Sequence, residues 1–307
     1  MISFSGKVKQ ELARIRLRGA AVCRAQLFGL TQAAGTLKLS GGMEYVTETR
    51  EVAEQAAKLA AQLYDAEAVL VSRAMEHRKL PLIVAALRGG RMNELPVDAG
   101  MITCTEEGVS LERRIPLEEL NSESTQRAFL RGVFLGAGSV SSPARAYHLE
   151  IVCASETLAA AVQEMLCAFD CNAKSVRRKN KHVVYLKEGD AIATFLALMG
   201  ASVATMEFES VRATKETNNY INRAANCDNA NIDKTVSAAA EQTAAIQKIL
   251  ASPRAQKRLS PVLRETAELR LNYPELSLSE LAALASVGRS GMNHRLQRLL
   301  DIAREMD

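Results

Sequence analysis

From residue 22 to residue 199, apolar residues follow a helical spacing and then a strand-like spacing, in the same order twice. A helix, two strands, a second helix and two more strands are predicted at residues 22–35, 36–40, 44–49, 51–64, 66–74 and 80–87. The second series is predicted at residues 124–137 (helix), 147–153 (strand), 156–169 (helix), 173–178 and 182–186 (hairpin) and 189–199 (helix). The order helix, two strands, helix, two strands combines helices and strands in one unit, and we expect an α+β fold.

Two glycine pairs mark the recurrence. Residues 25–36 align without gaps on residues 128–139, which brings Gly29 onto Gly132 and Gly35 onto Gly138. We expect the first glycine of each pair to let two helices approach closely, and the second to permit a left-handed exit into a strand. Glycine pairs also recur by chance, but the matching order of the elements that follow favours an internal duplication.

The chain after the second series is polar and rich in asparagine. Six asparagines between residues 207 and 232 predict turns and helix ends, because their side chains compete for backbone hydrogen bonds. Asp233 is then expected to cap a helix that ends at Leu250. The basic residues 251–258 lack apolar periodicity and predict a linker at a domain boundary.

The last fifty residues carry strong helix signals. Ser260 before Pro261 predicts a helix start, and that helix is expected to reach about residue 271, before Pro274. Ser277 and Glu280 form a capping box, and the flanking leucines at 276 and 281 fit a hydrophobic staple. A break at residues 286–288 and a third helix from Arg289 complete a predicted helix-turn-helix.

The third helix has two different faces when its residues are projected at about 100° each. Met292, Leu296 and Leu299 fall on one face and are expected to pack inward. The other face and its flanks offer groups suited to base edges and phosphates, against the alternative of an ordinary solvated helix. The predicted DNA-binding residues are Arg289, Ser290, Asn293, His294, Arg295, Gln297 and Arg298.

Residues 281–287, followed by residues 292–298, resemble the helix-turn-helix of bacterial sigma-factor region four. Ser286 stands where that family often has glycine in the turn, so Gly288 is expected to supply the flexibility instead.

Composition changes this picture little. The 307 residues are 48% hydrophobic and 24% charged, which excludes a wholly disordered chain. The net charge of +4 is too small to establish a polyanionic partner, so local clusters matter more. Six basic residues without an acid lie between residues 174 and 187. This hairpin is a candidate secondary DNA contact or simply a solvated loop, and its candidate residues are Arg177, Arg178, Lys179 and Lys181.

Several other functions lose support. The six cysteines and four histidines show no zinc spacing, so no metal or cofactor is predicted. Residues 136–138 (Gly-Ala-Gly) precede a strand rather than a helix, unlike a dinucleotide-binding loop. The N-terminal segment carries charges where a signal peptide needs an apolar stretch, and no uncharged run reaches the ~20 residues of a membrane helix. Unpaired thiols predict a cytoplasmic protein.

The two glycine-containing helices resemble degenerate LAGLIDADG motifs, as in single-chain homing endonucleases. In that family the penultimate motif residue is a metal-binding acid, but here Ala34 and Ala137 occupy those positions. Phosphodiester hydrolysis with divalent metal needs carboxylates, so we expect no catalytic residues and no enzyme activity. The nearest following acids are Glu44 and Glu150.

A LAGLIDADG-like scaffold followed by a helix-turn-helix resembles the WhiA family. The most specific stretches are residues 147–153, 183–189, 222–227, 230–236 and 290–296. The resemblance implies a nucleoid-associated transcription regulator that binds double-stranded DNA and is linked to division, chromosome segregation and sporulation. A metal-dependent endonuclease and a protein-docking scaffold, which could contact RNA polymerase or a co-regulator, are the alternatives.

The expected organisation is a duplicated LAGLIDADG-like scaffold with a separate all-α C-terminal domain. Its parts are two repeats (residues 1–120 and 121–225), a connecting helix (226–252) and a helix-turn-helix domain (253–307). The oligomeric state is left open.

Overall fold

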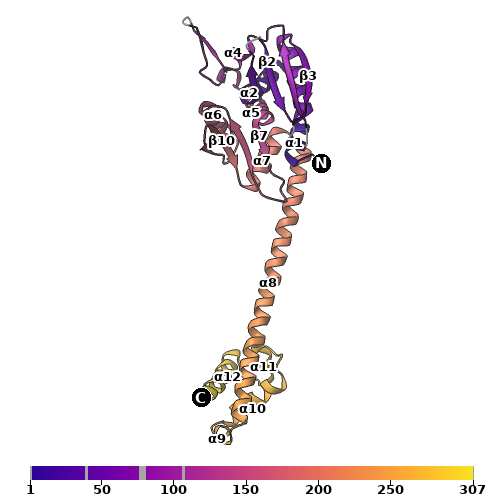
Figure 1. Cartoon of the computed structure of the whole chain (residues 1–307). Helices are drawn as coiled ribbons and strands as arrows, with labels where there is room; N and C mark the ends of the chain where they lie inside the picture. The colour runs from indigo at the N-terminus through magenta and orange to yellow at the C-terminus, as the bar shows by residue number, and fades with distance from the viewer. Residues whose placement is uncertain (1, 39–40, 76–80, 106–107, 307) are drawn as a thin grey trace. The chain divides into compact units, whose positions relative to one another are not determined.

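The computed structural model describes residues 2–38, 41–75, 81–105 and 108–306. The chain divides into two compact units, Met1–Lys215 and Glu216–Asp307 (Figure 1). One long helix, α8 (Ser202–Leu250), begins in the first unit and ends in the second. The expected domain edges at residues 120, 225 and 252 stay predictions, since both repeats share one hydrophobic core. Within the described ranges, no helix is long and apolar enough to cross a membrane.

The first unit contains two four-stranded antiparallel sheets with the same strand order. The first sheet has the order β1-β2-β4-β3 and the second β7-β8-β10-β9. The strands of the first sheet are β1 (Gly35–Leu37), β2 (Met43–Thr47), β3 (Glu67–Arg73) and β4 (Leu82–Arg88). Those of the second are β7 (Gly138–Val140), β8 (Leu149–Cys153), β9 (Lys174–Arg178) and β10 (Lys181–Leu186). The predicted duplication and the α+β class are therefore confirmed.

Helices cover one face of each sheet and join the two repeats. The long helices of the repeats are α2 (Ala20–Ala34), α3 (Arg50–Tyr64), α5 (Glu123–Ala137), α6 (Glu156–Ala168) and α7 (Gly189–Met199). Helix α3 packs on the first sheet and α6 on the second, while α2 and α5 pack on each other. These five helices lie within two residues of their predicted bounds.

The glycines of the repeats matter because a Cβ would not fit at their positions, and not because of their φ angles. A Cβ on Gly29 would lie 2.1 Å from the carbonyl oxygen of Phe129 in α5, so the close helix approach is confirmed. Gly35 and Gly138 have φ angles of −69° and −83°, so the expected left-handed exit is wrong. A Cβ on Gly138 would instead meet the ring of Phe134 at 2.1 Å.

Several elements were not predicted from the sequence. They are α1 (Phe4–Ala13), α4 (Leu95–Asp98), β5 (Thr103–Thr105), β6 (Gly108–Ser110), the 3-10 helix η1 (Leu117–Glu119) and strand β7. Helix α1 buries Phe4, Val8 and Leu12 in the core of the first unit. Glu11 of α1 accepts hydrogen bonds from the first backbone amides of α8, at Val203 (2.7 Å) and Ala204 (2.9 Å).

Helix α8 overturns the expectation of turns between residues 207 and 232. The whole asparagine-rich segment is helical, and the expected helix start at Asp233 is wrong, although the end at Leu250 is confirmed. Most side chains from residue 214 to residue 234 are exposed. Exposed asparagines can be solvated by water, so their competition with the backbone costs little when the ends of the helix are held in packed units.

The second unit is helical and has its own core. It contains α9 (Pro253–Gln256), α10 (Pro261–Asn272), α11 (Leu278–Leu284) and α12 (Arg289–Arg304). Residues 251–258 are not an unstructured linker, because Ser252 caps α9 and Ala255 is buried in that core. The cap at Ser260 and the capping box of Ser277 and Glu280 are both present, as predicted.

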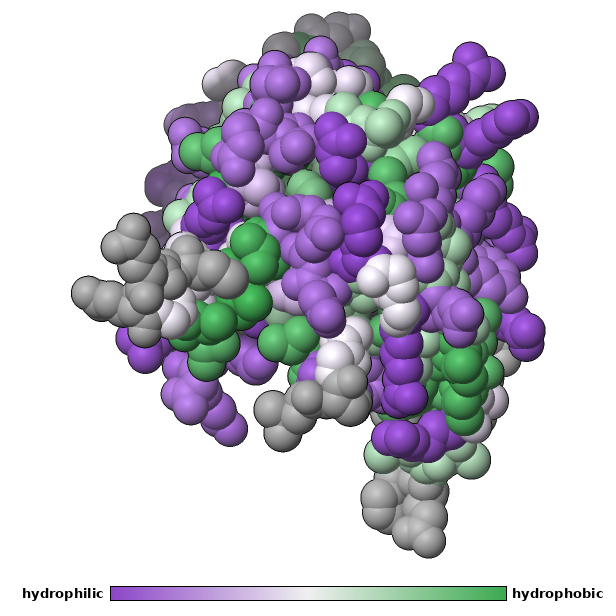
Figure 2. All heavy atoms as spheres, turned by 90° about the horizontal axis from the view of Figure 1, so that it is seen from above, coloured by the Kyte–Doolittle hydropathy of each residue, from purple (hydrophilic) through white to green (hydrophobic). Residues whose placement is uncertain are grey.

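The face of the molecule in Figure 2 is mostly hydrophilic. In the face shown in Figure 2, apolar residues form several separate areas among hydrophilic ones. The exposed large apolar residues of the first sheet are Leu37, Val46, Val69, Leu70 and Val71.

Candidate nucleic-acid interface

The turn between α11 and α12 is built by a serine in the left-handed region. Ser286 has a φ of +51°, and the backbone amide of Val287 donates to the carbonyl oxygen of Ala282 at 2.9 Å. Gly288 has extended backbone angles (φ −70°, ψ 151°) and is the N-cap of α12. The expectation that Gly288 supplies the unusual conformation is therefore wrong, because Ser286 adopts it itself.

Helix α12 separates a buried apolar face from an exposed polar one. Met292, Leu296 and Leu299 are buried in the core of the second unit, as predicted. Arg295 is half-buried at the edge of that face. The other six predicted DNA-binding residues are all exposed: Arg289, Ser290, Asn293, His294, Gln297 and Arg298.

The exposed face of α12 suits an anionic partner with hydrogen-bonding edges. Asn293 offers amide groups of the kind that read adenine, and arginines pair with guanine or with phosphate. The first turn of α12 contains no acid. The amide of Gln297 already donates to Asp301, one turn further on, at 3.2 Å. Gln297 must therefore give up this bond to use both amide groups elsewhere.

Buried and paired arginines hold the helix-turn-helix in place, and sequence reasoning missed their roles. The guanidinium of Arg270 donates to the carbonyl oxygens of Tyr273 (3.4 Å), Pro274 (3.4 Å) and Leu276 (2.8 Å), the segment that joins α10 to α11. Burial lowers the pKa of Arg270. At the end of α12, Arg304 pairs with Glu241 of α8 at 3.2 Å. The Arg270 bonds hold the segment before α11, and the exposed Arg304–Glu241 pair links the end of α12 to α8 within the second unit.

The basic hairpin of β9 and β10 does not present its four candidate residues together. Lys181 lies opposite Arg178, and both share the sheet face turned away from α6. Arg177 lies opposite His182 and belongs to the other face. Lys179 forms the tip with a φ of +53°. The structure thus brings Arg178 and Lys181 side by side and separates Arg177 from them.

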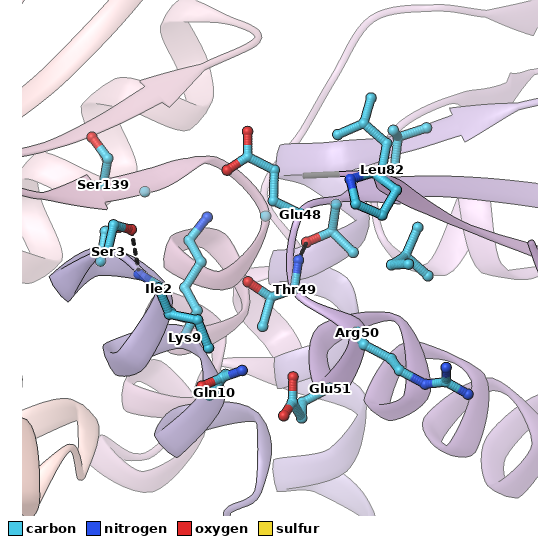
Figure 3. A pocket seen from close by; sticks show the side chains of 18 residues that line it. Ile2, Ser3, Lys9, Gln10, Glu48, Thr49, Arg50, Glu51, Leu82 and Ser139 are labelled. Carbon is cyan, nitrogen blue, oxygen red and sulfur yellow. Dashed lines mark hydrogen bonds between the residues drawn. The ribbon is translucent and has the colours of Figure 1, made fainter. Parts of the chain in front are cut away.

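Helix α1, strands β2 and β4 and the end of α5 border a cavity of about 830 Å³ in the first unit. Figure 3 shows Lys9 and Glu48 pointing into this space from α1 and from the end of β2, with Ser139 of β7 beyond them. Ala34 and Ala137 end α2 and α5 without a carboxylate. Burial lowers the pKa of Lys9 to about 8, and the carboxylate of Glu48 partly opposes this shift.

The acids nearest to the degenerate motifs are engaged. Glu44 forms an ion pair with Lys38. Glu150 lies 3.4 Å from the guanidinium of Arg178 and 3.2 Å from the ring of His148. In the part of the chain that the structure describes, no three acids, histidines or cysteines are grouped as a metal site requires.

Known proteins match the chain over both units. A model of the WhiA LAGLIDADG-like domain matches residues 126–218, and one of the WhiA C-terminal HTH domain matches residues 221–303. A "Probable cell division protein WhiA" from Alkaliphilus metalliredigens is 37% identical, covering 98% of each chain. A protein of the same name from Clostridium novyi is also 37% identical, covering 99% of this chain and 98% of the other.

The chain belongs to the WhiA family. The crystal structure of full-length WhiA from Thermatoga maritima has the same fold, with a TM-score of 0.60 and 24% identity over 99% of this chain and 98% of that one. The N-terminal LAGLIDADG domain of WhiA aligns with a TM-score of 0.51 and 22% identity over 65% of this chain and 94% of that domain. The predicted family and the LAGLIDADG-like scaffold with a helix-turn-helix are confirmed, and this WhiA family member is in general terms a DNA-binding regulator.

Proposed function

We propose that this WhiA family member is a transcription regulator that binds specific sites in double-stranded DNA through the exposed face of α12. The observation that carries the proposal is the division of α12 into a face buried by Met292, Leu296 and Leu299 and an opposite face of polar and basic side chains. The second helix of a helix-turn-helix is the element that enters the major groove. An exposed face of this composition supplies both base contacts and phosphate contacts.

The names of the relatives support a proposal for the biological role. Because they are named probable cell division proteins, we propose that this chain controls genes of cell division. Chromosome segregation and, in sporulating hosts, sporulation belong to the same proposal. The protein would act on the nucleoid in the cytoplasm, and RNA polymerase or a co-regulator is its proposed protein partner.

We also propose that the LAGLIDADG-like scaffold has no nuclease activity. Ala34 and Ala137 replace the acids that would hold divalent metal, and Glu44 and Glu150 are ion-paired in the sheets. Metal-assisted hydrolysis of a phosphodiester requires carboxylates free to bind the ions. Incubation of the pure protein with plasmid in Mg²⁺ or Mn²⁺ should leave the plasmid supercoiled. Nicking that disappears in Glu44→Gln or Glu150→Gln would contradict the proposal.

Selection of bound fragments from a random duplex library tests the DNA-binding proposal directly. We expect the full chain to enrich one sequence motif, and the variant Asn293→Ala/His294→Ala to lose that enrichment while staying folded. The matched control is Asn272→Ala, at the end of α10 rather than on α12. If the control and the α12 variant enrich the same motif as the native chain, α12 does not read the sequence.

A further inference from the structure

Strand β3 is an open edge of the first sheet. It pairs with β4 along its whole length, from Glu67 opposite Arg88 to Arg73 opposite Leu82, and among the described residues it has no other neighbour in that sheet. All seven residues of β3 are exposed, including Val69 (60%), Leu70 (39%) and Val71 (52%). An edge strand offers a row of backbone N–H and C=O groups to any strand that can align with it.

This edge lacks the usual devices that prevent pairing. The uninterrupted register with β4 leaves no bulge, and β3 (EAVLVSR) contains no proline and no lysine. Its charges stand only at the two ends, where they are of opposite sign. The central residues are β-branched or apolar and favour strand pairing.

The sequence of β3 is complementary to itself in the antiparallel direction. When two copies are aligned with Leu70 opposite Leu70, Glu67 of each lies opposite Arg73 of the other. Val69 then lies opposite Val71 on the same sheet face as the charged pairs, because side chains alternate along a strand. Cross-strand pairs of opposite charge and of β-branched residues stabilise a sheet by ~0.2–1 kcal/mol each.

We propose that two copies of this chain associate through antiparallel pairing of β3, about a two-fold axis at Leu70. The first sheet of each copy, with its four strands, then continues into that of the other copy as one eight-stranded sheet. A self-complementary patch of this kind is what a two-fold homodimer requires, since each residue meets its counterpart twice.

The second repeat provides an internal comparison. Its equivalent edge is β9, whose five residues are all exposed, as are those of β3. Antiparallel self-pairing of β9 about Val176 would place Lys174 opposite Arg178, a contact between like charges. Like charges directly opposite one another destabilise a strand pair. The duplicated fold therefore has one edge that disfavours self-pairing and one that favours it.

Sedimentation velocity of the full chain in a dilution series, without DNA, tests the proposal. We expect a monomer–dimer equilibrium. Glu67→Arg and Arg73→Glu should each weaken the dimer about tenfold or more, because each places like charges opposite one another twice. An equal mixture of the two variants should dimerise again, since every charged cross-strand pair then joins an arginine to a glutamate. The double variant Glu67→Arg/Arg73→Glu should dimerise with itself for the same reason.

Controls keep the outcome interpretable. Arg177→Glu changes an exposed charge on the other edge strand and should leave the dimer unchanged. Thermal unfolding should be similar for all variants at concentrations where they are monomeric, because the substituted side chains are exposed. A monomer throughout the dilution series would overturn the proposal. So would a dimer that Glu67→Arg and Leu70→Lys do not weaken, since it would use another surface. Neither result bears on DNA binding by α12, which the library selection measures separately.

Discussion

Gly29 of α2 and Gly132 of α5 lie face to face. A Cβ on either glycine would lie only 2.1 Å from a carbonyl oxygen of the other helix. The oxygens belong to Phe129 and Gln26. The contact joins the same position of two repeats, so it lies on the axis that relates them. No side chain fits there, and the two backbones pack directly on each other.

We expect Gly29→Ala to destabilise the first unit by about 3 kcal/mol, because the methyl group meets rigid backbone and the helices must move apart. Gly132→Ala should have a similar effect. Urea unfolding followed by circular dichroism measures both. The control is Gly291→Ala on α12, where a Cβ meets nothing within 4 Å. It should stabilise by up to about 1 kcal/mol through helix propensity. Equal stability of Gly29→Ala and the native chain would show that the helices cross elsewhere.

The left-handed backbone of Ser286 gives a second stability prediction. For a residue with a side chain this conformation costs ~1 kcal/mol or more, whereas glycine adopts it freely but loses more entropy on folding. Ser286→Gly should therefore stabilise the helix-turn-helix by about 0.5 kcal/mol, measured as a rise in the unfolding temperature of the second unit. Ser290→Gly, inside α12, should destabilise it by about the same amount. A loss of stability in Ser286→Gly would mean that residue 286 has a right-handed backbone in solution.

The exposed face of α12 predicts two kinds of DNA-binding defect. Asn293→Ala and His294→Ala should each cost ~1–3 kcal/mol on the preferred site and little on random DNA, because base contacts carry the specificity. Arg298→Ala should weaken binding to both by a similar factor, as expected for a phosphate contact. Affinities measured by fluorescence anisotropy for the selected site and for a scrambled duplex distinguish the two kinds of defect. If Arg298→Ala changed the ratio of the two affinities, Arg298 would be reading bases.

Periodic spacing predicted most of the repeated elements because their apolar residues face one shared core. Helices α2, α3, α5, α6 and α7, strands β1 to β4 and strands β8 to β10 were predicted this way. Strand β7 has only three residues, too few for a period to show. Helix α1 is the element that the sequence could have predicted, since Phe4, Val8 and Leu12 follow the N-cap Ser3 at helical spacing.

Tertiary context explains the remaining errors. Asparagine favours turns locally, but the segment between residues 207 and 232 continues a helix that Glu11 caps at its start. The Ser277–Glu280 capping box predicted α11 because both partners lie within one turn. The role of Arg270 was hidden, because its carbonyl partners belong to a loop whose path depends on the fold.

The arrangement of the basic hairpin sharpens the prediction of a second DNA contact. Arg178 and Lys181 share one sheet face, so Arg178→Ala/Lys181→Ala should lower the log–log salt slope of site binding by about 1.8, at ~0.9 per phosphate. Arg177→Ala, on the other face, should leave the slope unchanged. Titration of binding against KCl for the native chain and both variants measures this. Equal slopes for all three would mean that the hairpin is solvated and does not touch DNA.

The cavity between α1, β2 and the end of α5 predicts a pH dependence of stability through Lys9. Burial lowers the pKa of its ammonium to about 8 in the folded chain, against an ordinary value of 10.5, while Glu48 partly opposes the shift. At pH 7 the group is protonated in both the folded and unfolded states, so the cost of burying the charge is fully present. Between pH 8 and 10.5 the folded state releases this proton and the unfolded state keeps it, so the contribution of Lys9 to the free energy of unfolding becomes less unfavourable.

Lys9→Met removes both the charge and its titration. We expect the variant to be more stable than the native chain at pH 7, with an advantage that shrinks as the pH approaches 10.5. The unfolding temperatures of the two proteins at about pH 7, 8, 9 and 10 test this, and their difference cancels the titration of the tyrosines that both share. Lys7→Met is the control for the loss of a lysine from the same helix, since Lys7 is exposed and pairs with Glu207 at 2.9 Å. A difference between Lys9→Met and the native chain that stays constant over this range would show that the Lys9 ammonium is hydrated rather than buried in the cavity.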